Sequence, residues 1–548
     1  MKDVSSNTEV SSDTAESNTS SSKKSLVKKG ISLSILTLFS RILGLIREMT
    51  KAKFLGTSYY SDAFGIAFMI PNLFRRLFAE NSVSVAFIPT FKNYLEDSNT
   101  IEGKQTTQDF ICATFTLVTF LTTVLVSLGI IFTPLILKVF YKAENIDALT
   151  EATFLTRIMF PYLVVISIAA LFQGILNGLK IFSPSGFTPI LFNSIVIIST
   201  YVLAPKMQNP ARAMSIGVIL GGSVQALFQL PFVLKNNWKI TFTSLKKAFT
   251  NPGTKKVLAL VAPTIIGMAG YQLNDIVSSA LATRAGTGVV SSLQYSLRLQ
   301  ELILGICAVT VGTVILPDLT GYAKNTQWDK FNSLLSSSVN LIAFITIPIT
   351  FYAFLMGDNI ITLVFASGKF NADSIAMTRG VFNFHIIGLF FIAENRVLSQ
   401  AFYAQTDTKL PTIAGLINFF VNILFALILI KPMGGNGIAL ALTLASIVNT
   451  ICLFVFLAIK KTCPTKSVVK STILYSLKMI LFSAVSIIPV YFLKPVFVEK
   501  FANHSRLISQ GLPVLLTVLI FGFAGLLLMI ITKDPLVNTL RRKFSKKK

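Results

Sequence analysis

The chain has 548 residues, of which 53% are hydrophobic and 13% are charged, and its formal net charge is +25 at pH 7. Apolar runs of about twenty residues, the length that crosses a bilayer, recur along it and exclude an ordinary soluble protein. Two histidines, and four cysteines without metal-ligand spacing, leave no His-based catalytic triad and no Cys/His metal site. The long runs also differ from the short alternating segments of a membrane β-barrel. We therefore expect an all-α polytopic membrane protein.

The N-terminal segment, residues 1–25, is rich in Ser, Thr, Asn, Asp and Glu, and we expect a disordered cytoplasmic tail there. About fourteen candidate transmembrane helices follow it. Their predicted ranges are 30–54, 61–94, 107–140, 149–179, 184–205, 211–235, 254–284, 289–322, 330–357, 374–404, 408–431, 436–460, 470–496 and 506–532.

A long basic loop, residues 236–253, divides the first twelve spans into two sets of six. A weak repeat supports the division, because a proline followed by an asparagine recurs in both halves, at Pro189 and Asn193 and at Pro411 and Asn418. Parallel repeats of this kind are common in transporters. The predicted organisation is two six-helix lobes at 26–240 and 241–465, helices 13 and 14 within 466–532, and a basic cytoplasmic tail at 533–548.

Lysines concentrate in the loop after span 6, in the loop after span 12 and in the C-terminal tail. The positive-inside rule then places these segments and both termini in the cytoplasm. In a soluble protein a charge of +25 would indicate nucleic acid, but here topology and anionic phospholipids explain it and no nucleic acid is expected. The expected location is the bacterial cytoplasmic (inner) membrane.

Polar and charged side chains interrupt the first two spans. A charge at mid-membrane costs roughly 2.5–3.5 kcal/mol, so such residues are kept where they face a protein interior or a watery cavity. Arg47 lies nearer the end of span 1 and could instead extend to the membrane interface. One helical face of span 1 carries Ser34, Thr37, Arg41, Gly44 and Glu48, and span 2 carries Asp62, Asn72, Arg75, Arg76 and Glu80.

Four arginines against three acids in these two spans leave a net positive site, and the planar fork of arginine matches phosphate oxygens. An ion-pair network that only joins the two helices is the alternative, with Arg76 and Glu80 as one pair. On span 8, Arg298 shares a face with Gln294 and Glu301, and Glu301 alone could satisfy it. Glu394 and Arg396 on span 10 are interpreted as an internal pair.

At these residues the sequence resembles the MurJ (MviN) lipid II flippases of the multidrug/oligosaccharidyl-lipid/polysaccharide exporter superfamily. The resemblance covers about residues 26–530. A Pro-Asn-x-x-Arg-Arg run inside a membrane helix is its most specific part. The motifs that carry it are Ser40–Glu48, Ser61–Phe64, Pro71–Glu80, Phe160-Pro161-Tyr162, Leu316-Pro317, Gly368-Lys369-Phe370 and Phe402–Thr408.

The resemblance implies a transporter and not an enzyme, which flips lipid-linked peptidoglycan precursor by alternating access through a cationic central cavity. It implies that helices 13 and 14 form a groove for the polyprenyl tail. Asn81 and Leu297 depart from the family, which usually has Gly at the first position and in some members an acid at the second. The implied substrate-binding residues are Arg41, Arg47, Asp62, Asn72, Arg75, Arg76, Glu80 and Arg298.

Other functions remain open at this point. The substrate could be another polyprenyl-pyrophosphate-linked glycan, and a non-transporting scaffold for cell-wall synthesis enzymes would not need the charged stripe. A cation-coupled multidrug exporter would favour buried acids over arginines. No Walker motif is present, so ATP is not expected to be the direct drive. No cofactor is assigned, and the membrane potential or a monovalent ion is the candidate drive. Candidate partners are lipid II, anionic phospholipids and cell-wall synthesis enzymes.

Overall fold

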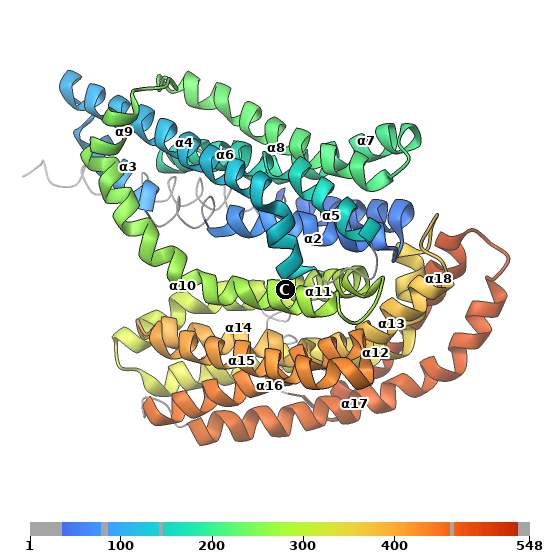
Figure 1. Cartoon of the computed structure of the whole chain (residues 1–548). Helices are drawn as coiled ribbons and strands as arrows, with labels where there is room; N and C mark the ends of the chain where they lie inside the picture. The colour runs from blue at the N-terminus through green and yellow to red at the C-terminus, as the bar shows by residue number, and fades with distance from the viewer. Residues whose placement is uncertain (1–35, 78–85, 142–145, 461–464, 535–548) are drawn as a thin grey trace, which may run out of the picture. The chain divides into compact units, whose positions relative to one another are not determined.

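The computed structural model describes residues 36–77, 86–141, 146–460 and 465–534, and all regular secondary structure in these ranges is helical. A first helix covers residues 36–55. The labelled helices that follow (Figure 1) are α2 (Tyr59–Phe74), α3 (Ile88–Asp97), α4 (Ile101–Phe140), α5 (Ile146–Met159), α6 (Tyr162–Gly178), α7 (Ser183–Leu203), η3 (Ala204–Lys206), α8 (Pro210–Lys235), α9 (Leu245–Thr250), α10 (Pro252–Ala282), α11 (Val289–Lys324), α12 (Trp328–Phe365), α13 (Ala372–Ile387), α14 (Leu389–Tyr403), α15 (Lys409–Met433), α16 (Gly435–Lys460), α17 (Thr465–Lys500) and α18 (Arg506–Ile531).

Nine helical segments in the described residues are long and apolar enough to cross a membrane, or ten if the bent pair α13 and α14 is one span. The predicted all-α membrane fold is confirmed. Four further predicted spans fall on the helix of residues 36–55, on α2 with α3, on α10 and on α11. The count of fourteen is consistent with this arrangement and stays a prediction.

The chain divides into two units, each described here by itself. The first unit takes in residues up to Thr50, Ala67–Thr133 and Phe154–Met268. The second takes in Lys51–Ile66, Pro134–Thr153 and the chain from Ala269 onward. The division therefore passes through the helix of residues 36–55 and through α2. The predicted lobes, 26–240 and 241–465, stay a prediction.

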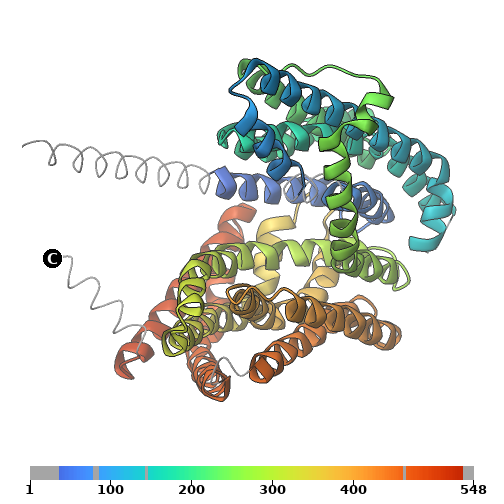
Figure 2. The ribbon, with the colours of Figure 1, turned by 90° about the vertical axis from the view of Figure 1, so that its left-hand side faces the viewer.

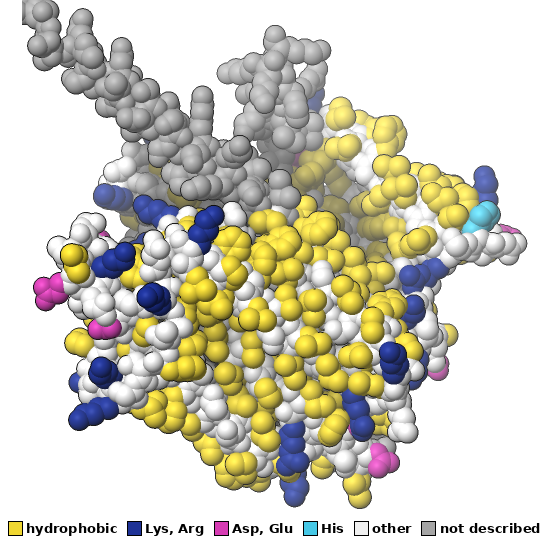
Figure 3. All heavy atoms as spheres, turned by 90° about the horizontal axis from the view of Figure 1, so that it is seen from above, with side chains coloured by type: hydrophobic (Ala, Val, Ile, Leu, Met, Phe, Trp, Pro, Cys, Tyr) yellow, Lys and Arg dark blue, Asp and Glu magenta, His cyan; other side chains and the backbone are white. Residues whose placement is uncertain are grey.

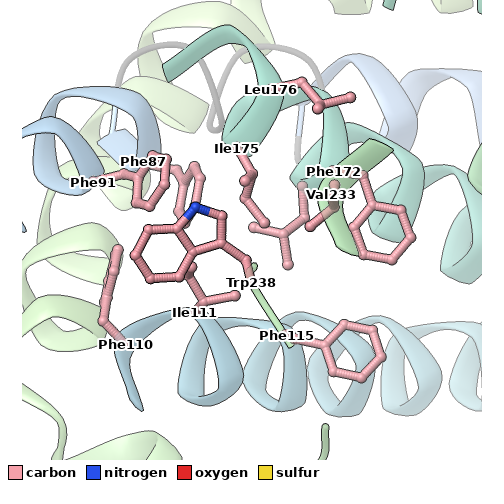
Figure 4. Packing of buried hydrophobic residues seen from close by; sticks show 11 residues of the cluster. Phe87, Phe91, Phe110, Ile111, Phe115, Phe172, Ile175, Leu176, Val233 and Trp238 are labelled. Atoms are coloured by element: carbon pink, nitrogen blue, oxygen red, sulfur yellow. The ribbon is translucent and has the colours of Figure 1, made fainter. Parts of the chain in front are cut away.

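In the first unit, α8 packs on both α6 and α7. Aromatic and branched side chains from α3, α4, α6 and α8 form its core, and Figure 4 shows the Trp238 indole among them. Trp238 belongs to the segment after α8, whose backbone is fixed on α4: Gln108 bonds both the N–H and the carbonyl of Lys239, at 3.0 and 2.6 Å. The long basic loop thus begins with a segment that is bonded to the first unit.

In the second unit, α15 and α16 form a tight antiparallel pair joined at Gly434, which has a positive φ of 56°. α17 packs on α12 and on α18, and Figures 1 and 2 show α15 and α16 running side by side. The chain bends by 41° between α13 and α14 at Gly388. A Cβ at Gly388 would lie 2.4 Å from the Thr443 hydroxyl oxygen, so only glycine permits this close packing on α16.

Hydrophobic side chains predominate over the central part of the face in Figure 3, while Lys and Arg lie mainly toward its edges. On α4, for example, Leu128, Ile131 and Leu135 are exposed. Exposed apolar patches of this extent on a soluble protein would mark an interface. On a membrane protein they form the surface that contacts lipid.

Candidate functional site

Arg47 on the first helix is half-buried within the first unit. One guanidinium nitrogen lies 2.8 Å from Glu48 Oε1, and the other donates to Asn193 Oδ1 of α7 at 3.2 Å. The same group lies about 6 Å from the ring centres of Phe68 and Phe192, at 6.0 and 5.9 Å. The two aromatic rings and Asn193 therefore hold the Arg47 side chain within the first unit.

Asn193 was not among the predicted site residues, although its repeat with Asn418 was visible in the sequence. Its amide nitrogen also donates to the carbonyl of Pro189 at 3.0 Å, a bond that spans one helical turn. Arg41, one and a half turns before Arg47, is half-buried in the same unit. Both arginines of span 1 are therefore half-buried in the first unit, and Asn193 fixes one of them, Arg47.

The paired arginines of span 2 lie where α2 changes its geometry. The helix widens into a π-helical turn over residues 75–77, a feature that often occurs at functional sites. Arg75 Nε donates to Asn72 Oδ1 at 2.9 Å, and Arg75 and Arg76 are both half-buried. Asn72 thus orients Arg75 directly. Glu80 lies outside the described residues.

Asp62 belongs to the second unit and is 3% exposed. Its two carboxylate oxygens accept the backbone N–H groups of Gly288, at 2.6 Å, and Ser291, at 2.8 Å. These are free N–H groups at the first turn of α11, where a negative charge is favoured. Gly288 has a φ of 86°, and a Cβ there would lie 2.4 Å from the Thr57 carbonyl oxygen. The carboxylate therefore fixes the start of α11 on the first turn of α2.

Replacing Asp62 should cost stability. In Asp62→Ala both N–H groups lose a charged acceptor, and each such bond contributes about 1.5–3 kcal/mol. We expect the purified variant to melt well below the wild type, with Asp62→Asn in between because one acceptor oxygen remains. Thermal unfolding in detergent measures this. A variant Asp62→Ala with the wild-type melting temperature and no transport would contradict the capping role and favour direct substrate binding.

Lys51 is a charged residue that the sequence interpretation missed. It is 2% exposed, and its ammonium group donates to Gln294 Oε1 at 2.7 Å and lies 5.1 Å from the ring centre of Tyr295. Tyr295 in turn donates to the carbonyl of Gly56 at 2.9 Å. Lys51 follows Glu48 by three residues, so continuing the polar stripe of span 1 by one step would have found it.

Arg298 on α11 belongs to the second unit, unlike the arginines of spans 1 and 2. One guanidinium nitrogen lies 3.3 Å from Glu301 Oε2, and Glu301 is 58% exposed. Arg298 Nε is buried and, among the described residues, has no hydrogen-bond partner. Glu301 therefore satisfies only part of the guanidinium, and the remaining donors are available to another group.

The expected pair of Glu394 and Arg396 does not form in the part of the chain that the structure describes. Glu394 is 1% exposed and its Oε1 has no partner there. Residues two positions apart on a helix point to different sides, which explains why Glu394 and Arg396 do not pair. Within the same ranges no cluster of three or more His, Cys, Asp or Glu side chains could hold a metal ion.

A pocket of about 200 Å³ lies on α12, α17 and α18, the last two being the predicted helices 13 and 14. Its lining is almost entirely apolar and includes Phe344, Met479, Phe521 and Leu526. An apolar pocket on these helices fits the expectation of a groove for a hydrocarbon tail.

A family model described as lipid II flippase MurJ matches residues 51–510. The chain belongs to this family. It is 44% identical over 515 residues to a probable lipid II flippase MurJ of Treponema pallidum, which covers 94% of this chain and 97% of the relative. It is 32% identical over 428 residues to the lipid II flippase MurJ of Burkholderia cenocepacia, covering 77% and 82%.

A solved MurJ structure in an inward closed conformation superposes with a TM-score of 0.76 at 28% identity, covering 92% of this chain and 99% of that one. An inward-facing MATE family transporter of the MOP superfamily gives a TM-score of 0.65 at 13% identity, which shows a shared fold. Membership of the MurJ family confirms the resemblance drawn from the arginine motifs. It also makes the protein a multi-pass membrane protein and implies the inner membrane.

Proposed function

We propose that this protein flips lipid II, the lipid-linked peptidoglycan precursor, from the inner to the outer leaflet of the cytoplasmic membrane. The match to MurJ proteins over most of the chain carries this proposal. The protein is accordingly a transporter and not an enzyme, with a role in peptidoglycan biosynthesis, cell-wall biogenesis and cell shape.

The physical problem is to move a charged head group across hydrocarbon. A pyrophosphate cannot cross about 30 Å of hydrocarbon unaided, whereas a polar cavity open first to one side and then to the other lowers the barrier. We propose that Arg41, Arg47, Arg75, Arg76 and Arg298 bind the pyrophosphate in such a cationic cavity. The half-buried positions of these arginines on membrane helices support the role. Guanidinium forks bind phosphate oxygens in pairs.

The polyprenyl tail would stay in lipid while the head group moves, and the pocket on α12, α17 and α18 is the proposed contact for it. An inside-negative membrane potential would favour outward movement of an anion, by about 2.3 kcal/mol per charge per 100 mV. The membrane potential or a monovalent ion is therefore the proposed drive. Anionic phospholipids at the basic loops and cell-wall synthesis enzymes are the further proposed partners.

Depletion of the protein in its native cell tests the function. We expect lipid II to accumulate on the inner leaflet and the cells to lose shape and lyse, with recovery on re-expression. Accumulation of a different polyprenyl-linked glycan would show the alternative substrate. If no lipid-linked precursor accumulates but wall-synthesis enzymes are mislocalised, the scaffold alternative holds.

The proposed topology has both termini in the cytoplasm. In a Cys-free background, cysteines at Lys246 and Lys466 should resist an impermeant thiol reagent in intact cells, because their basic loops face inward. A cysteine at Arg284, in the exposed turn between α10 and α11, should react. Permeabilised cells provide the control, in which all three sites react. The reverse pattern in intact cells would overturn the orientation and the direction of transport.

A further inference from the structure

A second and larger apolar groove lies in the second unit, with a volume of about 1000 Å³. It is bounded by α12, the α13–α14 pair, α16 and α17, which Figure 1 shows in neighbouring positions, whereas α18 takes no part in it. It is thus distinct from the tail pocket on α12, α17 and α18. Nothing in the proposed transport of the head group uses this groove.

The groove is built for hydrocarbon over most of its length. Aromatic side chains line it, namely Phe351, Phe390, Phe391 and Phe454. The apolar side chains along its α16 and α17 edges are exposed, among them Ile451, Ile473, Leu474 and Leu477. A groove with exposed apolar edges on a membrane protein opens toward lipid chains, and not toward water.

Two lysines lie at one end of the lining, Lys466 and Lys470 on the first turns of α17. Both are exposed, and among the described residues neither takes part in an ion pair. They are four residues apart, so their side chains lie on one face of the helix. A pair of unneutralised ammonium groups at the end of an apolar groove has the charge that complements a lipid phosphate.

The dimensions agree with one lipid molecule. The lining of α17 runs from Thr465 to Ile480, and fifteen residues of helix rise about 22 Å. One leaflet takes up about half of a hydrocarbon core of roughly 30 Å, together with a head-group layer of roughly 5–8 Å. A lipid whose phosphate is bound at Lys466 and Lys470 therefore places its chains along the aromatic part of the groove.

Two buried polar atoms of the lining have no hydrogen-bond partner among the described residues, Glu394 Oε1 and Ser476 Oγ. Ser476 follows Lys470 by six residues, about 9 Å along the helix. That separation slightly exceeds the head-group layer of roughly 5–8 Å, so Ser476 lies at the edge of the hydrocarbon core. An occupant with ester oxygens would supply acceptors at the depth of the Ser476 hydroxyl, which a bare hydrocarbon chain would not.

We propose that the groove of α12, α14, α16 and α17 binds an anionic diacyl phospholipid, with its phosphate on Lys466 and Lys470 and its chains on the aromatic lining. This site is separate from the arginine site and does not depend on lipid II as the transported substrate. A phospholipid held here would bind along α12 and α17, the helices that also line the tail pocket.

Native mass spectrometry of the full-length protein, with added palmitoyl-oleoyl phosphatidylglycerol or phosphatidylcholine, tests whether the two lysines select an anionic lipid. Wild type should retain phosphatidylglycerol in preference. Lys466→Gln/Lys470→Gln should weaken that binding by roughly 25-fold, about fivefold for each lysine. The control Lys324→Gln/Lys330→Gln removes two exposed charges of the second unit that do not line the groove, and it should bind as wild type does. Equal loss in both variants, or an unchanged preference in the groove variant, would overturn the proposal.

Ala458→Trp tests the groove itself. Ala458 is an exposed residue of the lining, so an indole there fills the groove without altering any charge or disturbing the core. We expect loss of the retained phosphatidylglycerol with an unchanged melting temperature. Retention at the wild-type level would show that the lipid binds elsewhere.

Competition for the groove by other phosphate compounds distinguishes which of them it binds. Inorganic phosphate at millimolar concentration should not displace phosphatidylglycerol, since it makes none of the apolar contacts. Undecaprenyl phosphate should compete more weakly than a second anionic phospholipid, because it has no ester oxygens. Displacement by inorganic phosphate would show that the two lysines alone account for binding. Stronger competition by undecaprenyl phosphate would show that the groove binds a polyprenyl lipid. Either result would contradict the proposal.

Discussion

Arg75→Ala and Arg76→Ala should each abolish growth in a strain depleted of the native protein, while the variants reach the membrane at a near-normal level. Both arginines are half-buried at the π-helical turn of α2, where Asn72 holds Arg75 at 2.9 Å. A lost charge-assisted hydrogen bond to phosphate costs about 1.5–3 kcal/mol, which lowers binding of the head group about 10- to 150-fold. Complementation, with a membrane immunoblot, measures the effect.

Conservative and control variants distinguish specific phosphate binding by Arg75 from a nonspecific effect of its positive charge. Arg75→Lys should support slow growth, because the charge remains but the planar fork is lost. Asn72→Ala should weaken transport less than Arg75→Ala does, since it removes only the group that orients Arg75. Arg157→Ala, at an exposed arginine of the same unit, should grow normally. A fully functional Arg75→Ala/Arg76→Ala double variant would rule out phosphate binding at this turn and favour the scaffold alternative.

Sequence spacing predicts which residues share a face of one helix. Arg41 and Glu48 belong to one such face, and both are half-buried in the structure. Spacing alone does not say which neighbouring helix receives a face, and for that reason Asn193 as a partner of Arg47 was missed. The partner of a side chain depends on packing between segments 146 residues apart in the chain.

Asp62 is a second residue whose partners could not be identified from the sequence. An acid at the start of a membrane span, beside an arginine motif, was interpreted as a helper in substrate binding. Its observed acceptors are backbone N–H groups of residues 226 and 229 positions away, at the first turn of α11. Backbone donors carry no signature in the sequence, so no residue pattern could identify this contact. The substrate role of Asp62 stays a prediction beside the structural one.

Glu394 was paired with its nearest cation along the chain, because proximity in sequence is the simplest guide. The structure instead leaves its Oε1 without a partner, in the lining of a groove that four helices or helix pairs build. A groove assembled from residues 347 to 480 has no linear motif. Lys466 and Lys470 were visible in the sequence only as topology signals, and their place at the end of this groove required the fold.

Arg298→Ala should produce a stable but inactive protein. If Arg298 only satisfied Glu301, its removal would leave an unpaired acid, which costs about 3–5 kcal/mol when the acid is buried. Glu301 is 58% exposed, however, so it needs no partner, and Arg298 Nε has no acceptor among the described residues. Loss of the arginine should therefore change the melting temperature little while removing most of the transport.

Arg298 is also the proposed phosphate ligand of the second unit, whereas Arg75 and Arg76 belong to the first. The proposed mechanism uses both sets of arginines, so neither set should replace the other. Arg298→Lys should keep partial activity, and Glu301→Gln should keep most of it, because that change removes the ion pair but leaves the guanidinium. Thermal stability in detergent and complementation are measured together. Should Arg298→Ala unfold readily, and Arg298→Ala/Glu301→Ala recover both stability and growth, Arg298 is a structural partner of Glu301 and the second unit must bind phosphate through another residue.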